Sequence, residues 1–121
     1  MKKQLEKRLI VFSSNVISIT DQMIKSKASN HLYGQVLRSA TSSALNYGEA
    51  QNAESKKDFI HKISIVLKEL RETYINLSII ETSKFISNKK VICDLLSENN
   101  ELLAIFTKTL QTTRKNHSGG V

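Results

Sequence analysis

Proline is absent from all 121 residues of this chain, and glycine occurs only four times. These two residues interrupt helices most strongly, and tight turns between strands depend on them. Their scarcity therefore favours long helices over a sheet with many turns. The composition agrees, because hydrophobic residues make up 40% of the chain and aromatic residues only 6%, a balance that suits an all-helical bundle.

Apolar residues recur at alternating steps of four and three along four segments, which is the spacing of a helix packed on one side. The predicted helices run from about residue 3 to about 27, from about 32 to about 51, from Ser55 onward, and from about 88 to about 115. The seam residues are Leu5, Leu9, Phe12, Val16, Ile19 and Met23, then Tyr33, Leu37, Ala40, Ala44 and Tyr47, then Phe59, Ile63, Val66, Leu70, Thr73, Leu77 and Ile80, and finally Ile92, Leu96, Leu103, Phe106 and Leu110. Helices joined by short loops predict an all-α, antiparallel up-down-up-down four-helix bundle.

Polar residues with capping propensity separate these segments. Ser29-Asn30 predicts the start of the second helix, and Asn52 predicts its end in a left-handed conformation. Ser55 begins a capping box in which Asp58 stands where Glu is usual, and Ser87-Asn88 predicts the start of the fourth helix. The polar run 97–100 predicts a bend or fraying inside that helix.

The length is that of one domain, with a bundle over 1–116 and a disordered tail over 117–121. Apolar runs reach at most five residues, too few to span a membrane, and the basic amphipathic start does not suit a secretory signal. Cys93 is the single cysteine, and a chain without an internal disulfide fits a reducing compartment. We interpret Cys93 as a small apolar residue rather than as a reactive thiol. We therefore expect a cytoplasmic protein.

The second and third helices differ in the bulk of their side chains. Every side chain from Ser39 to Ala44 is Ser, Ala or Thr, and Gly48 lies in the helix interior, where glycine costs roughly 1 kcal/mol relative to alanine. Gly48 indicates either a tight contact or simple tolerance. The third helix instead carries apolar residues beyond its seam, which predict a second contact such as one with another subunit. These residues are Ile60, Leu67, Tyr74 and Ile75.

The segment from Gln35 to Thr73 resembles the four helix bundle protein family, also called the 23S rRNA intervening-sequence protein or S23-like family. The matching strings are Leu37-Arg38-Ser39-Ala40-Thr41-Ser42, Asn46 with Glu49, Ala50 to Lys62, and Leu67-Lys68-Glu69-Leu70-Arg71-Glu72-Thr73. The string Glu54-Ser55-Lys56-Lys57-Asp58-Phe59-Ile60 is the most specific of them. The layout of the flanking helices extends the resemblance to residues 5–115.

The resemblance implies a small bacterial cytosolic protein with a four-helix fold, in a family whose members mostly have no known biochemical role. A relative of the same fold is the accessory protein of diversity-generating retroelements. The resemblance describes that relative as a ring-shaped homopentamer that binds nucleic acid and a reverse transcriptase. By resemblance, the expected partners are further copies of the chain in a pentamer, RNA or DNA, and a protein such as a reverse transcriptase.

The net charge is +7, which permits binding to nucleic acid. Candidate contacts are Arg38, Lys56, Lys57, His61, Lys62, Lys68 and Arg71. Four of them, Lys57, His61, Lys68 and Arg71, share one face of the third helix in a basic stripe about 20 Å long, which could follow several phosphates. The alternative is a solvated face balanced by nearby acidic residues. No exposed aromatic residues are interleaved with the stripe, so stacking on single-stranded bases is not indicated.

Asn46 and Glu49 lie one helical turn apart and are predicted to be a structural polar pair that orients neighbouring helices, with a polar contact or acid site as the alternative. Arg38 could pair with an acid across the bundle. The histidines are dispersed, and His61 with Asp58 alone does not make a metal site. The chain also lacks a Gly-x-Ser-x-Gly elbow and a glycine-rich phosphate loop. We therefore expect no catalytic residue, no metal and no cofactor.

Together these patterns predict a non-catalytic, homo-oligomeric accessory protein whose basic surface contacts RNA or DNA. The alternative is a scaffold that binds another protein through the broad apolar surface of the third helix, without nucleic acid.

Overall fold

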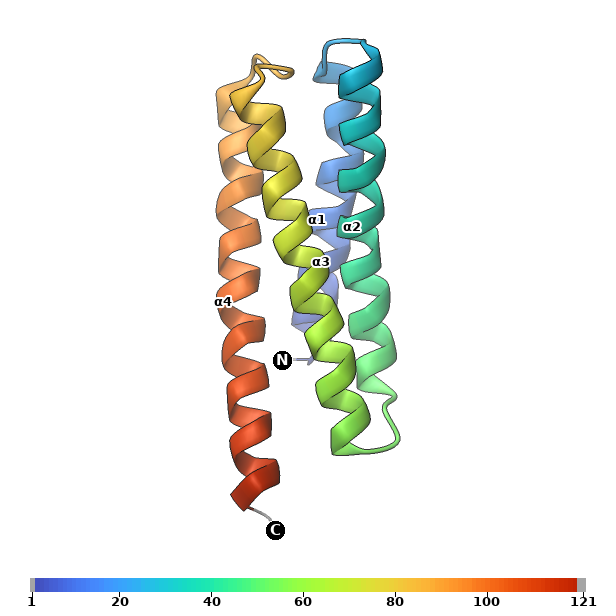
Figure 1. The fold of residues 1–121 in the computed structure, drawn as a ribbon, viewed down its shortest axis with the longest axis vertical. Coiled ribbons are helices and arrows are strands. Elements are labelled where there is room, and N and C mark those ends of the chain that lie inside the picture. Colours follow the sequence, from blue (N-terminus) through green and yellow to red (C-terminus); the bar gives the residue numbers. More distant parts are fainter. Residues whose placement is uncertain (1, 120–121) are drawn as a thin grey trace.

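The computed structural model describes residues 2–119, which form an antiparallel four-helix bundle with up-down-up-down connections (Figure 1). The helices are α1 (Lys2–Ser18), α2 (Lys27–Gln51), α3 (Lys56–Thr82) and α4 (Lys89–Gly119), with a short 3-10 helix η1 (Ile19–Gln22) after α1. Helix α2 packs between α1 and α3, and α4 packs mainly on α3. The predicted fold class and topology are confirmed.

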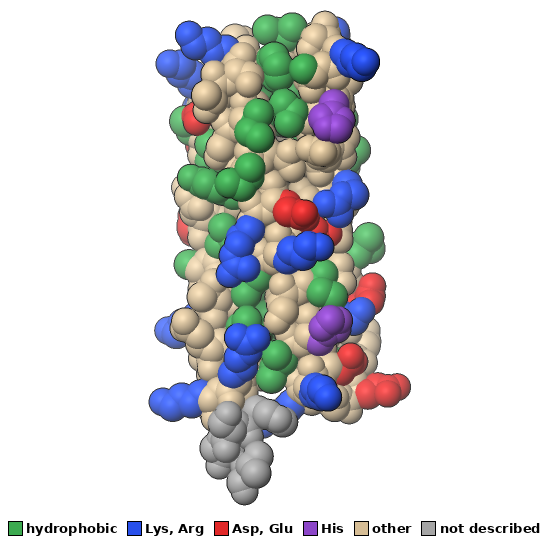
Figure 2. Space-filling view, in the orientation of Figure 1, with side chains coloured by type: hydrophobic (Ala, Val, Ile, Leu, Met, Phe, Trp, Pro, Cys, Tyr) green, Lys and Arg blue, Asp and Glu red, His purple; other side chains and the backbone are tan. Residues whose placement is uncertain are grey.

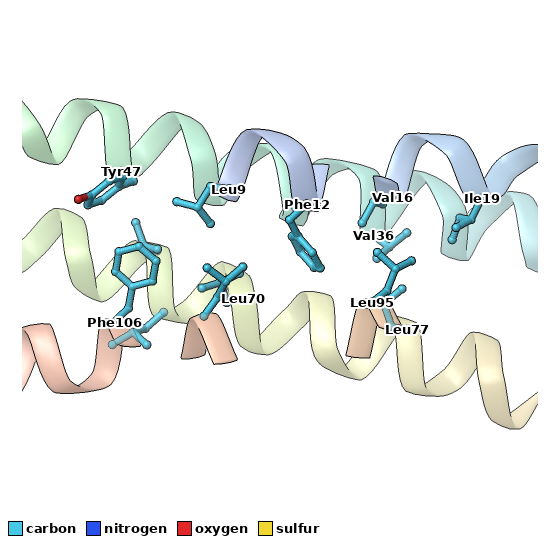
Figure 3. Close-up of a cluster of buried hydrophobic side chains, with 14 of the residues drawn as sticks. Leu9, Phe12, Val16, Ile19, Val36, Tyr47, Leu70, Leu77, Leu95 and Phe106 are labelled. Carbon is cyan, nitrogen blue, oxygen red and sulfur yellow. The ribbon is translucent and has the colours of Figure 1, made fainter. Parts of the chain in front are cut away.

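One hydrophobic core runs along the bundle axis (Figure 3). Phe12, Leu70 and Phe106 are fully buried, and the rings of Tyr47 and Phe106 meet edge to face with centroids 5.1 Å apart. In α1 and α3 the buried line follows the predicted seam closely. In α2 and α4 it is shifted by one residue at several turns, since the buried residues there include Val36, Leu95 and Leu102, while Leu37, Leu96 and Leu103 are half-buried.

The first helix ends nine residues before the predicted boundary near residue 27, at Ser18. Met23 is extended (φ −88°, ψ 144°) and pairs with Ile86 in an isolated antiparallel bridge. The backbone amide of Ile24 donates to the carbonyl of Phe85 at 2.8 Å. The loop after η1 is therefore held against the loop between α3 and α4, and this long-range pairing overrides the local helical pattern.

The second helix begins earlier than predicted. Ser26 is its N-cap, and the hydroxyl groups of Ser26 and Ser29 each accept the other residue's backbone amide at 3.1 Å. Asn52 ends α2 at φ −105° and ψ 18°, so the left-handed end predicted there is wrong.

The predicted starts of α3 and α4 are confirmed. The hydroxyl of Ser55 accepts the Asp58 amide at 3.1 Å, and the side-chain oxygen of Asn88 accepts the Val91 amide at 3.2 Å. The bend predicted at 97–100 is wrong because α4 is continuous there. Asn99 is buried and donates its amide to the carbonyl of Leu70 on α3 at 3.0 Å, which ties the polar run into the bundle. Helix α4 continues past residue 116 to Gly119, and residues 120–121 of the predicted tail lie outside the described residues.

Substitution of Leu70 by alanine tests the core assignment. Leu70 is fully buried, so Leu70→Ala should lower the free energy of unfolding by about 2–5 kcal/mol through lost burial and a residual cavity. The control Val11→Ala changes a surface residue and should shift it by about 0.5 kcal/mol or less. Urea unfolding measures both, and equal small changes would contradict the core assignment.

The end of α3 offers a stabilising substitution. Lys84 has φ 59°, and the amides of Lys84 and Phe85 donate to the carbonyls of Glu81 and Ile80 at 3.0 and 3.1 Å. This is a Schellman motif, whose left-handed position glycine occupies without strain. Lys84→Gly should raise the free energy of unfolding by about 1 kcal/mol, whereas Lys68→Gly, inside α3, should lower it by about 1 kcal/mol. Thermal unfolding of the two variants should therefore show shifts of opposite sign.

Candidate functional site

The basic stripe lies on the outer surface of α3. Lys57, His61, Lys68 and Arg71 are all exposed, and none of them forms an ion pair with a described side chain. Lys56, another candidate contact, is exposed at the first residue of α3. The helix rises about 1.5 Å per residue, so the stripe presents its positive charges over about 20 Å.

Arg38 is not part of this free set, because its guanidinium is bound by two carboxylates of α3. It donates to Glu69 at 3.0 Å and to Glu72 at 3.1 Å. The hydrogen bond to Glu69 is the main cause that raises the pKa of Arg38 above its ordinary value. These contacts agree with the sequence-based expectation that Arg38 pairs with an acid across the bundle. Arg38 therefore joins α2 to α3.

Glu69 is a buried carboxylate within this contact. Burial alone would raise its pKa, but hydrogen bonding with neighbouring side chains, including the bond that Arg38 donates at 3.0 Å, and the positive charge of Arg38 outweigh burial. The pKa of Glu69 therefore lies below its ordinary value, and the buried group remains a carboxylate at neutral pH. An ionised buried group of this kind requires a partner, which Arg38 supplies.

Lys62 is the second candidate contact whose charge is matched. Its ammonium group donates to Glu49 on α2 at 2.6 Å, and this hydrogen bond raises the pKa of Lys62. Asn46, the predicted partner of Glu49, instead donates to the carbonyl and the hydroxyl of Ser42 within α2, at 2.9 and 3.1 Å. Glu49 therefore links two helices through Lys62, and Asn46 contributes only to its own helix.

Buried hydroxyl groups connect the same two helices, and the sequence-based search for sites did not identify them. The hydroxyls of Ser39 and Thr73 lie 2.7 Å apart, and Thr73 donates to the carbonyl of Glu69 at 2.8 Å. On the other side of α2, the hydroxyl of Ser13 on α1 donates to the carbonyl of Ala40 on α2 at 3.1 Å. The signal in the sequence was the polar Thr73, which interrupts the otherwise apolar seam of the third helix. Thr73 lies opposite the small residues of α2.

The charged side chains do not form one continuous basic patch. Figure 2 shows Lys and Arg spread over this face of the molecule with acidic side chains among them, and hydrophobic side chains gathered toward the end that carries the α1–α2 and α3–α4 connections. On α3, the exposed Ile75 and Ile79 follow the basic stripe toward that end.

A groove of about 290 Å³ lies between α1 and α4, with Phe12 and Leu95 among its apolar lining residues. Its two carboxylates are already paired, Glu98 with Arg8 at 2.6 Å and Asp94 with Lys90 at 2.9 Å. Within the described chain, no three side chains of His, Cys, Asp or Glu gather as a potential metal site. None of the described helices has the length and apolar character needed to cross a membrane.

The lowered pKa of Glu69 predicts a pH-dependent stability. Because the folded chain holds this proton less tightly than the unfolded chain, the stabilisation is complete above the ordinary pKa of 4.5 and is lost as pH falls through the lower folded value. Between about pH 6 and about pH 3, the free energy of unfolding should fall more for the natural chain than for Glu69→Gln, whose amide does not titrate. Parallel losses in urea titrations of the two proteins would contradict this assignment.

The comparisons with known proteins agree with this architecture. A family model described as 23S rRNA-intervening sequence protein matches residues 2–108. A solved structure of a protein of unknown function from the S23 ribosomal protein family, from Bacteroides thetaiotaomicron VPI-5482, superposes with a TM-score of 0.79 at 24% identity, covering 88% of this chain and 97% of that one. No match was found among curated proteins. The match over nearly the whole described bundle shows that the chain belongs to the 23S rRNA-intervening sequence protein family.

Proposed function

We propose that this chain is a non-catalytic, homo-oligomeric accessory protein whose basic stripe on α3 contacts RNA or DNA. The observation that carries the proposal is the division of the cations along the helix. Arg38 and Lys62 are matched by carboxylates, while Lys57, Lys68 and Arg71 are exposed and lack an ion-pair partner among the described side chains. A row of unmatched cations binds phosphates favourably, because its binding releases the counterions that are condensed on the nucleic acid.

The geometry supports contact with a backbone rather than with bases. The stripe lies on the outside of one helix and includes no Phe, Tyr or Trp side chain, so it lacks a row of large rings on which successive bases could stack. Lysine and arginine on a helix surface can follow successive phosphates with little dependence on base sequence. The expected ligand is therefore a duplex or a structured RNA, bound with weak sequence preference and strong dependence on salt.

A triple substitution tests the stripe. Replacing Lys57, Lys68 and Arg71 by alanine removes three phosphate contacts, so the slope of log binding constant against log salt concentration should become shallower by about 2–3. Fluorescence anisotropy with short labelled RNA and DNA duplexes, over a salt series, measures this slope.

The matched control removes three exposed lysines from other helices, Lys3, Lys27 and Lys89, with the same loss of net charge. This control should change the slope much less. Equal effects of the two triple variants would show diffuse attraction rather than binding by the stripe, and absence of binding at low salt would reject the nucleic-acid role.

A protein scaffold is the second candidate, and the exposed apolar side chains favour it. Ile75 and Ile79 are 57% and 42% exposed at the end of α3, and such side chains suit a protein surface rather than phosphates. Capture of a specific protein partner by a chain that fails to bind duplexes at low salt would support this function over the first.

A further inference from the structure

A hollow of about 360 Å³, here called the α2–α3 pocket, lies where the outer sides of these two helices meet. It is lined by Gln35 and Arg38 from α2 and by Arg71, Glu72, Ile75 and Asn76 from α3. Its size falls in the range of small-ligand sites, and it combines hydrogen-bond donors and acceptors with one apolar side chain. The pocket shares Arg71 with the basic stripe, so a nucleic acid bound to the stripe lies beside the pocket.

The charged groups of the pocket are held in place by the fold. Glu69, which is 4% exposed, accepts a hydrogen bond from the Arg38 guanidinium at 3.0 Å, and Glu72 accepts one from the same guanidinium at 3.1 Å. The buried carboxylate therefore fixes Arg38, and Arg38 in turn orients Glu72. A site whose polar groups are already oriented loses little conformational freedom when a ligand binds.

These groups also keep free hydrogen-bonding capacity toward a ligand. A guanidinium has five N–H donors, and Arg38 uses two of them while its side chain is 60% exposed. The Oε1 atom of Glu72 forms no hydrogen bond with a described group, because only its Oε2 atom accepts from Arg38. The pocket thus offers a carboxylate oxygen with guanidinium donors on either side, from Arg38 and from Arg71.

This combination discriminates among the four bases of a nucleic acid. Guanine presents two adjacent donors, N1–H and N2–H, next to the acceptor O6, so a carboxylate can accept from the donors while an arginine donates to O6. Adenine and cytosine place an acceptor ring nitrogen where the carboxylate requires a donor. Uracil has a single N–H between two carbonyl oxygens. A carboxylate beside guanidinium groups therefore favours guanine.

We propose that the α2–α3 pocket binds an unpaired guanine base of a structured RNA whose backbone lies on the basic stripe. A paired guanine is unsuited, because its N1–H and N2–H already bond to cytosine, whereas the bases of bulges and loops in folded RNA can turn outward. Ile75, which is 57% exposed, supplies apolar surface to the ring. The planar guanidinium of Arg71 is a group on which such bases stack.

This inference rests on the nucleic-acid role in the proposed function and specifies its ligand. The stripe contacts phosphates, which are alike in every sequence, so it provides attraction without base preference. The pocket adds a preference at one position, where the backbone on the stripe brings an unpaired base beside Glu72.

Fluorescence anisotropy with labelled RNA hairpins is the measurement. The hairpins share one duplex and differ only in a single bulged nucleotide, which is guanine, adenine, cytosine, uracil or absent. The natural chain should bind the guanine bulge about 10-fold to 100-fold more tightly than the others, which is the discrimination expected of one bidentate contact. Inosine in place of the bulged guanine lacks only the N2 amino group and should weaken binding by about threefold to tenfold.

Glu72→Gln tests the pocket while leaving the stripe intact. The substitution replaces one acceptor oxygen by a donor, so the preference for guanine should disappear. The variant should still bind the hairpin without a bulge, with the salt dependence of the natural chain, because Glu72 makes no phosphate contact. Glu81→Gln is the matched control, since it makes the same change at an exposed residue of α3 outside the pocket, and it should keep the preference. Circular dichroism should show that both variants are folded.

Several results would overturn the pocket assignment. These are equal affinity for all bulges, a stronger preference for another base, a guanine preference that survives in Glu72→Gln, or its equal loss in Glu81→Gln. A natural chain that binds the hairpin without a bulge in a salt-dependent way, yet shows no guanine preference, rejects the pocket and leaves the proposed function standing. Absence of binding to every hairpin at low salt rejects the nucleic-acid role and the pocket together.

Discussion

The hydrogen bond between Ser39 and Thr73 joins two fully buried hydroxyl groups at the centre of the α2–α3 contact. A buried hydroxyl without a partner is destabilising, so this pair favours one register of α2 against α3 over its neighbours. The small side chains of α2 are what allow the two helices to approach closely enough for the hydroxyls to meet. Sliding α2 by one turn would separate this pair and would also part Arg38 from the buried Glu69.

That register decides which cations remain available at the surface. Arg38 and Lys62 lie along the α2–α3 boundary, where Glu69 and Glu49 match their charges. Lys57, Lys68 and Arg71 lie on the outer side of α3, away from the boundary, and have no such partners among the described side chains. The net charge of +7 belongs to the whole chain. It therefore does not indicate how many cations of α3 remain free to bind a polyanion.

Local sequence predicted the buried line closely in α1, where Leu9, Phe12 and Val16 are buried, and in α3, where Ile63, Val66 and Leu70 are buried. The buried line of α4 was displaced because Leu95-Leu96 and Leu102-Leu103 are apolar pairs, and periodicity alone cannot select which member points inward. The end of α1 was missed because Met23 is drawn into an extended conformation by Ile86, more than sixty residues away in the chain. Likewise, the sequence identified the basic residues but could not assign the ion pairs, since these depend on the register between helices.

The outer side of α3 changes character along its length, because the exposed cations Lys57, Lys68 and Arg71 are followed by the exposed Ile75 and Ile79. Under the proposed function, a polyanion would contact the first of these two segments. Three positive charges bind a duplex weakly, but the proposed homo-oligomer would hold several stripes in a fixed arrangement, so each bound stripe would raise the local concentration of the next. Binding and assembly would then be thermodynamically linked, because a polyanion that spans two stripes favours the assembled state by the same factor by which assembly strengthens binding.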